Sequence, residues 1–247
     1  MSDATQRPGR PGFFFGFALP SRALTLLLSD RHLLGLALLP FLLGVGLSVW
    51  LGKSLNDLLY ERATGVLAHF GFEATGLLGA LLGYLIGFLA LLSSALLLPF
   101  VNSLAAVPFN DFLAEATETR ARPPLAPVPG PNLGQRMALI WMDLAKTGAA
   151  LLVTLPLLVL SFVPGAQIVC FPLLWLLYAF QMLSFPQTRR AEGVGDAVRF
   201  IRANLGACLG FGFAHALIGI VPLVSHLGPP LAVVGGTLLY ARAVAAR

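Results

Sequence analysis

Residues 33–51 of the chain, LLGLALLPFLLGVGLSVWL, contain no charged side chain. As an α-helix this run would be about 28 Å long, close to the roughly 30 Å hydrocarbon core of a bilayer. Ser29-Asp30 precedes it as a helix N-cap, and Trp50 and Lys53 suit the aromatic and basic belt at a membrane interface. We therefore predict a first transmembrane helix over 33–51.

The composition of the whole chain agrees with an integral membrane protein. Of its 247 residues 57% are hydrophobic and 11% are charged, whereas about a quarter of a soluble domain is charged. The net charge is +5, but no basic run exceeds Arg189-Arg190, so nucleic acid is not an expected partner. Cys170 and Cys208 both lie in apolar stretches, which predicts buried thiols and no metal site.

The regions on either side of this first helix differ in polarity. Residues 1–12 are polar and rich in Pro and Gly, which predicts a disordered tail before one membrane domain over 13–247. Residues 13–32 combine a phenylalanine cluster with arginines, which favours an interfacial segment at the lipid headgroups. Residues 52–73 are partly amphipathic and are predicted to form a helix outside the membrane.

A second charge-free run predicts another long transmembrane helix, over 74–107. Pro108 ends it, and Asn110 can cap a new polar helix. We predict that 111–147 lies on the cytoplasmic side and contains helices joined by a Pro-rich loop.

The last hundred residues contain two apolar regions, 148–183 and 205–241, each interrupted near its middle. The predicted tips contain residues that break helices, namely Pro164, Gly165, Pro222 and Pro229. Each region is either a pair of ordinary spans or a re-entrant hairpin that enters the membrane and returns. The predicted fold is thus all-α, with two long transmembrane helices and two Pro/Gly-broken C-terminal hairpins.

Either arrangement returns each hairpin to the side that it left. Most arginines then share one face with both termini, and the opposite loop carries only Lys53 and Arg62. Because basic residues concentrate in cytoplasmic loops, we expect both termini in the cytoplasm.

Four segments together resemble a known family. They are LLPFLLGVGLSVW at 38–50, VNSLAAVPFNDFLAEATETR at 101–120, SFVPGAQIVCFPLLWLLYAFQMLSFP at 161–186 and FGFAHALIGIVPLVSHLGPPLAVVGGTLLY at 211–240. Their order and spacing are similar to those of the CysZ-type sulfate permeases and the etoposide-induced protein 2.4 family. The resemblance implies two long helices with two partly penetrating hairpins, a homo-oligomer in the inner membrane, and passive sulfate uptake for cysteine synthesis. It implies no cofactor.

An anion conduit needs hydrogen-bond donors and positive potential, which arginine and helix N-termini supply. The candidate anion-binding residues lie at the starts of two predicted helices: Arg31, Asn110, Asp111, Phe112 and Glu115. Gln167 and His215 are polar residues in apolar surroundings and are candidate pore-lining residues. The alternatives are an interface anchor for Arg31 and structural hydrogen bonds for Gln167 and His215.

The chain departs from the family pattern at two places. Asp111 and Phe112 follow the P-F-N turn where the permeases usually have Gly and Leu, and Arg31 stands where they have an arginine pair. Asp111 adds negative charge to the predicted anion site, which favours an alternative function as a non-transporting membrane scaffold or biogenesis protein. No cluster of catalytic or metal-ligating residues occurs, so we expect no enzyme.

Overall fold

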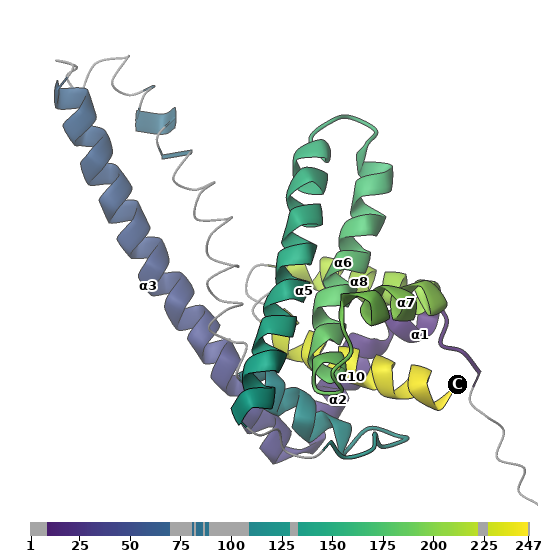
Figure 1. Cartoon of the computed structure of the whole chain (residues 1–247). Coiled ribbons are helices and arrows are strands. Elements are labelled where there is room, and N and C mark those ends of the chain that lie inside the picture. The colour runs from purple at the N-terminus through teal and green to yellow at the C-terminus, as the bar shows by residue number, and fades with distance from the viewer. Residues whose placement is uncertain are drawn as a thin grey trace, which may run out of the picture. The chain divides into compact units, whose positions relative to one another are not determined.

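The structure is a computed structural model that describes residues 9–69, 81, 83–85, 87–88, 109–128, 133–221 and 227–246. Within those residues all regular structure is α-helical, which confirms the predicted fold class (Figure 1). The helices are α1 (Phe13–Phe17), α2 (Leu19–Ser29), α3 (Arg31–His69), α5 (Leu133–Leu160), α6 (Gln167–Thr188), α7 (Val194–Ala203), α8 (Leu205–Gly219) and α10 (Gly228–Ala245). Residues 109–118 form a further helix, here called the 109–118 helix.

The chain divides into two compact units. The main unit combines Met1–Leu38 with Phe109–Arg247, and the second unit is Leu39–Pro108. Helix α3 begins in the main unit, where Leu33 and Ala37 are buried, and continues into the second. The candidate sites discussed below all lie in the main unit.

Helix α3 begins where the sequence predicts. Asp30 Oδ1 accepts the backbone N–H groups of His32 and Leu33 at 2.9 and 3.1 Å, as an N-cap does. The helix then runs unbroken for 39 residues, about 58 Å. Residues 52–69 are therefore part of this same helix and do not form a separate one. The predicted helix over 74–107 lies outside the described residues except for 81, 83–85 and 87–88.

The core of the main unit is built around α8 and α10. Thirteen of the 18 residues of α10 are buried. One buried cluster includes Leu19 of α2, Leu183 of α6, Phe211 of α8 and Leu239 of α10. Each such side chain contributes about 1.5–3 kcal/mol through burial, so this cluster fixes α2, α6, α8 and α10 together.

Glycines let the helix backbones of this core approach closely. A Cβ on Gly16 would lie 1.9 Å from the backbone oxygen of Ala207, and one on Gly210 would lie 2.1 Å from that of Phe13. A Cβ on Gly212 would lie 2.2 Å from the backbone oxygen of Trp175 in α6. The α1–α8 and α6–α8 crossings therefore require glycine, as small-residue helix contacts in membranes do.

Helices α5 and α6 form an antiparallel hairpin that projects from the rest of the main unit (Figure 1). Its tip falls at the predicted Pro164-Gly165 break, where Gly165 has φ of +87° and donates its N–H to Gln167 Oε1 at 3.1 Å. Met137–Leu160 and Gln167–Thr188 are each long and apolar enough to cross a membrane. Helix α5 begins at Leu133, so the end of the predicted cytoplasmic region 111–147 and the start of the predicted hairpin 148–183 form one continuous helix.

Helices α8 and α10 form the second hairpin, and its interruption also lies near the predicted position. Helix α8 ends at Gly219 and α10 begins at Gly228. Pro222 lies outside the described residues, and Pro229 lies in the first turn of α10, where a proline breaks no helical hydrogen bond. Helix α7 meets α8 at a bend of 97°, and the two together also have the length and apolar composition of one span.

Candidate functional site

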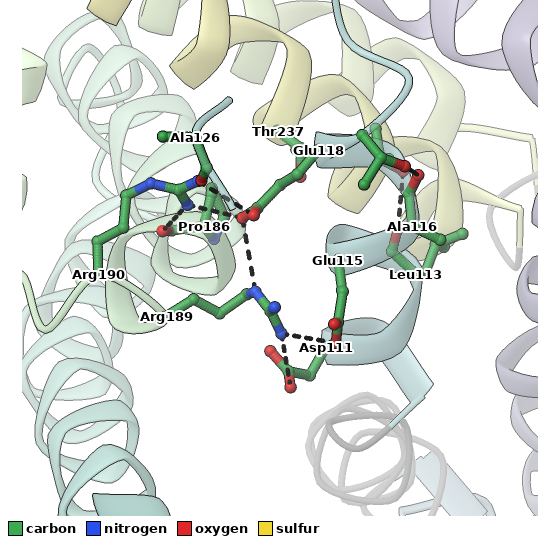
Figure 2. A network of polar contacts seen from close by, with 12 residues as sticks. Asp111, Leu113, Glu115, Ala116, Glu118, Ala126, Pro186, Arg189, Arg190 and Thr237 are labelled. Carbon is green, nitrogen blue, oxygen red and sulfur yellow. Dashed lines mark hydrogen bonds and ion pairs between the residues drawn. The ribbon is translucent and has the colours of Figure 1, made fainter. Parts of the chain in front are cut away.

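An arginine cluster joins the end of α6 to the 109–118 helix; it consists of Asp111, Glu115, Glu118, Arg189 and Arg190 (Figure 2). Arg190 Nη1 and Nη2 donate to Glu118 Oε1 and Oε2 at 2.7 and 3.1 Å. Glu118 is buried, and this bidentate pair is the strong form of an arginine–carboxylate contact. The pair therefore fixes the 109–118 helix against α6.

Arg189 lies close to all three carboxylates of the arginine cluster. Its Nη1 donates to Glu115 Oε2 at 3.0 Å and lies 3.5 Å from Asp111 Oδ2, and its Nε lies 3.6 Å from Glu118 Oε1. Burial raises the pKa of the Asp111 carboxyl above its usual value, and the charge of Arg189 opposes that effect. Three carboxylates thus face two guanidinium groups, so an added anion would have to compete with carboxylates already in place.

The other two candidates on the 109–118 helix have different surroundings. Asn110 is buried, and its Oδ1 has no hydrogen-bond partner among the described residues. The Phe112 side chain is exposed. The structure therefore places Asp111 and Glu115 in the arginine cluster, while Phe112 is exposed on the surface.

Arg31, the first residue of α3, is exposed, and its guanidinium group forms no hydrogen bond or ion pair with another described residue. The N–H groups at this helix start are already bound by Asp30, which also accepts a hydrogen bond from Arg120. That bond to Arg120 and the bond from the Leu33 N–H hold the pKa of Asp30 below its usual value. An anion at this position could bind only to the Arg31 side chain, because Asp30 already accepts the free N–H groups at the start of the helix.

The two candidate pore-lining residues both make local contacts. His215 is buried in α8, with its Nδ1 at 2.9 Å from the backbone oxygen of Phe211 and its ring centroid 5.3 Å from that of Tyr178. Its Nε2 has no partner in the described part of the chain. Gln167 lies at the tip of the first hairpin. A pore-lining role for either residue remains a prediction.

The structure also shows a lysine cluster that sequence reasoning did not find; it consists of Asp143 and Lys146 of α5 with Ser184 and Thr188 of α6. Lys146 Nζ donates to Thr188 Oγ1 at 2.9 Å. Ser184 Oγ donates to Asp143 Oδ1 at 2.6 Å, and Thr188 Oγ1 does so at 3.4 Å. Only residue spacing in the sequence could have indicated this cluster. Positions 143 and 146 share one face of a helix, and so do 184 and 188.

The fold and these polar clusters define an all-α integral membrane protein with charged groups at the ends of apolar helices. The family described as Sulfate transporter CysZ/Etoposide-induced protein 2.4 matches residues 19–243. The chain belongs to this family, which confirms the resemblance noted in the sequence.

Curated relatives carry the name Sulfate transporter CysZ. The protein of Pseudomonas paraeruginosa (strain DSM 24068 / PA7) is 33% identical over 153 residues, covering 58% of this chain and 61% of its own length. That of Pectobacterium atrosepticum is 27% identical over 224 residues, covering 82% of this chain and 76% of its own length. The match to the Pseudomonas protein thus spans less than two thirds of that relative.

Proposed function

We propose that this protein is an inner-membrane permease or channel that conducts sulfate or a related small oxyanion passively into the cell for cysteine synthesis. The observation that carries the proposal is family membership over residues 19–243, together with relatives named sulfate transporters. The apolar helices α5 and α6 supply surfaces suited to a bilayer. We further propose cytoplasmic termini and, as the resemblance implies, a homo-oligomer.

One structural observation favours the alternative of a non-transporting scaffold or biogenesis protein. Two of the five predicted anion-binding residues, Asp111 and Glu115, are carboxylates that hold Arg189, and Glu118 beside them holds Arg190. A scaffold needs no anion site, and this cluster by itself stabilises the packing of the 109–118 helix on α6.

Sulfate flux into liposomes separates the two functions. Purified protein is reconstituted, and labelled sulfate uptake down a gradient is compared with that of protein-free liposomes. A permease gives uptake that needs no ATP, whereas uptake equal to the empty liposomes would favour the scaffold. Genes for cysteine synthesis beside this gene would independently favour a sulfate role.

Arg31→Ala tests the exposed candidate in the same assay. Because a charged hydrogen bond contributes about 1.5–3 kcal/mol, we expect sulfate flux to fall about ten-fold or more if Arg31 binds the ion. Arg22→Ala is the matched control, since Arg22 is also an exposed arginine near the N-terminus but lies over the Phe15 ring. Equal flux in both variants would leave permeation intact and remove Arg31 from the site.

A further inference from the structure

The start of α1 packs on the start of α8, so the beginning of the described chain lies beside the bend between α7 and α8. A Cβ on Gly206 would lie 3.4 Å from the backbone nitrogen of Phe13 and 4.0 Å from the backbone carbon of Gly12. A Cβ on Gly210, one turn further along α8, would lie 2.1 Å from the backbone oxygen of Phe13. These glycines therefore bring α1 to the point where α7 ends and α8 begins.

Helix α7 is amphipathic and turns sharply away from α8. The two helices meet at 97°, and α8 contains no lysine, arginine, aspartate or glutamate. The inward face of α7 places Ala197 and Phe200 in the core. Arg199 and Arg202 are exposed on its other side. A charged helix at about a right angle to an apolar one has the geometry of a helix that lies along a membrane surface.

Large apolar side chains are exposed on both segments of this contact. Phe14 of α1 is 83% exposed, and Phe13 beside it is 38% exposed. On the other segment, Leu205 at the start of α8 is 47% exposed and Val198 of α7 is 37% exposed. Single exposed hydrophobic residues are ordinary, but a group of them where two segments meet marks an interaction surface.

Two arginines near the same contact carry unpaired charge. Arg10 lies two residues before Gly12, Arg202 lies four residues before Gly206, and both arginines are exposed. Neither guanidinium group forms a hydrogen bond or ion pair with another described residue, unlike those of the arginine cluster. Both groups are therefore available to an external anion.

No acidic residue of these segments neutralises the two charges. The sequence has no aspartate or glutamate from 4 to 29 and none after Asp196. Asp196 itself pairs with Arg199. Glu192, just before α7, accepts the Tyr240 hydroxyl at 2.6 Å. The surface thus combines exposed apolar groups with uncompensated positive charge, which is complementary to an anionic lipid.

We propose that α1 and the α7–α8 bend together form a docking surface for anionic phospholipids. Arg10 and Arg202 bind the lipid phosphate groups, and Phe14 and Leu205 enter the upper part of the acyl layer. A free oxyanion would use only the arginines, whereas a lipid matches the cations and the apolar groups together. This inference goes beyond the proposed transport function and does not depend on it, because a permease and a scaffold would both lie in a bilayer.

The test compares lipids added to the purified full chain in detergent, with the midpoint of thermal unfolding as the readout. Dioleoylphosphatidylglycerol should stabilise the wild-type protein more than dioleoylphosphatidylcholine does, because only the first lipid has a net negative headgroup. Glycerol 3-phosphate at the same concentration should stabilise it no more than sodium chloride of equal ionic strength does.

Removing the arginines should remove the preference for the anionic lipid. We expect the apparent affinity for phosphatidylglycerol to fall about five-fold for Arg10→Gln and again for Arg202→Gln, while Arg202→Lys keeps most of it. Phe14→Ser should weaken the binding of both lipids alike, because it removes an apolar contact that they share. Arg122→Gln is the matched control: it removes an exposed arginine from a stretch where no described large hydrophobic side chain between Phe112 and Met137 is exposed.

Several results would overturn the lipid surface. These are equal stabilisation of wild type by the two lipids, an unchanged preference in the double variant Arg10→Gln/Arg202→Gln, and stabilisation by glycerol 3-phosphate as large as that by phosphatidylglycerol. A loss in Arg122→Gln equal to that in Arg10→Gln would do the same, because net charge alone would then explain the preference. If Arg202→Gln does not give folded protein, Arg10→Gln decides. Sulfate flux is not part of this measurement, so its failure and the failure of the permease function are distinguishable.

Discussion

The two C-terminal hairpins share a sequence pattern but differ in length. In the first, α5 has 28 residues and α6 has 22, which correspond to about 42 and 33 Å of helix. In the second, α8 has 15 and α10 has 18, about 22 and 27 Å. Against a hydrocarbon core of about 30 Å, each helix of the first hairpin is long enough to cross, whereas α8 and α10, each taken alone, are shorter than that core.

The two hairpins also differ in how deeply their helices are buried. Within its most apolar stretch α5 is 11% buried, and Leu152 and Val159 are more than 70% exposed. Helix α10 is almost enclosed by α2, α6 and α8. The same Pro/Gly interruption therefore produces an outward-facing hairpin in one case and the packed core in the other.

The largest effect is expected at the close helix crossings of the second hairpin. Gly212→Ala would place a Cβ 2.2 Å from the backbone oxygen of Trp175, so α8 and α6 would have to separate. We expect loss of folded protein, measured by size-exclusion chromatography and thermal unfolding in detergent. Gly148→Ala in α5 is the control, since its added Cβ would meet no atom of another helix within 4 Å among the described residues. Equal yields of folded Gly212→Ala and Gly148→Ala protein would contradict the idea that the second hairpin is the more tightly packed.

Cysteine labelling tests the difference in length. A thiol introduced by Phe162→Cys, near the tip of the first hairpin, should react with a membrane-impermeant maleimide from the side opposite the termini. A thiol from Leu227→Cys, before α10, should not react from that side if the second hairpin fails to cross. Cys170 and Cys208 are buried, which keeps the background low. Reaction of both or of neither from that side would contradict the comparison.

The stability of the packing at the C-terminal end of α6 should depend on Glu118, the buried carboxylate of the arginine cluster. Glu118→Ala leaves Arg190 without its bidentate partner, and breaking a buried pair costs about 3–5 kcal/mol. The stability loss is measured by thermal unfolding of the purified variant. Glu115→Ala is the comparison, because its side chain is 57% exposed and should cost less than about 1 kcal/mol. A larger loss for Glu115→Ala would be the contrary result.

The smallest expected effect concerns pH. A carboxyl whose pKa is raised in the folded state binds its proton more tightly there, so stability falls as pH rises through that pKa. Asp111→Asn should therefore raise stability slightly at pH 7 and make no difference well below pH 4, with about 0.5 kcal/mol as the upper limit because the side chain is half-buried and partly screened by water. Unfolding of both proteins across this pH range measures it. A variant less stable than wild type at pH 7 would show that the ion pair with Arg189 dominates.

Features set by local chemistry could be predicted from the sequence. Pro164-Gly165 ends a helix because proline lacks an N–H and glycine accepts a positive φ, and Asp30 caps α3 with its own side chain. The continuation of α3 past Leu51 could not be predicted, because charged residues end a membrane span without ending a helix.

The polar clusters depend on tertiary packing and so remained hidden. Arg190 and Glu118 are 72 residues apart in the chain, and no local pattern pairs them. Lys146 belongs to a stretch that looks amphipathic, and its buried side chain donates to Thr188 of α6, 42 residues away. The predicted anion site therefore included Asp111 and Glu115 without the arginines that bind them.

The contact of Gly16 with Ala207 joins the beginning of the chain to its last helices. During synthesis α1 emerges first, but the surface that receives it exists only after α8 has been made. The packing of the main unit must therefore be completed late in synthesis. Ribosome release should then be the event that allows this protein to close its own fold.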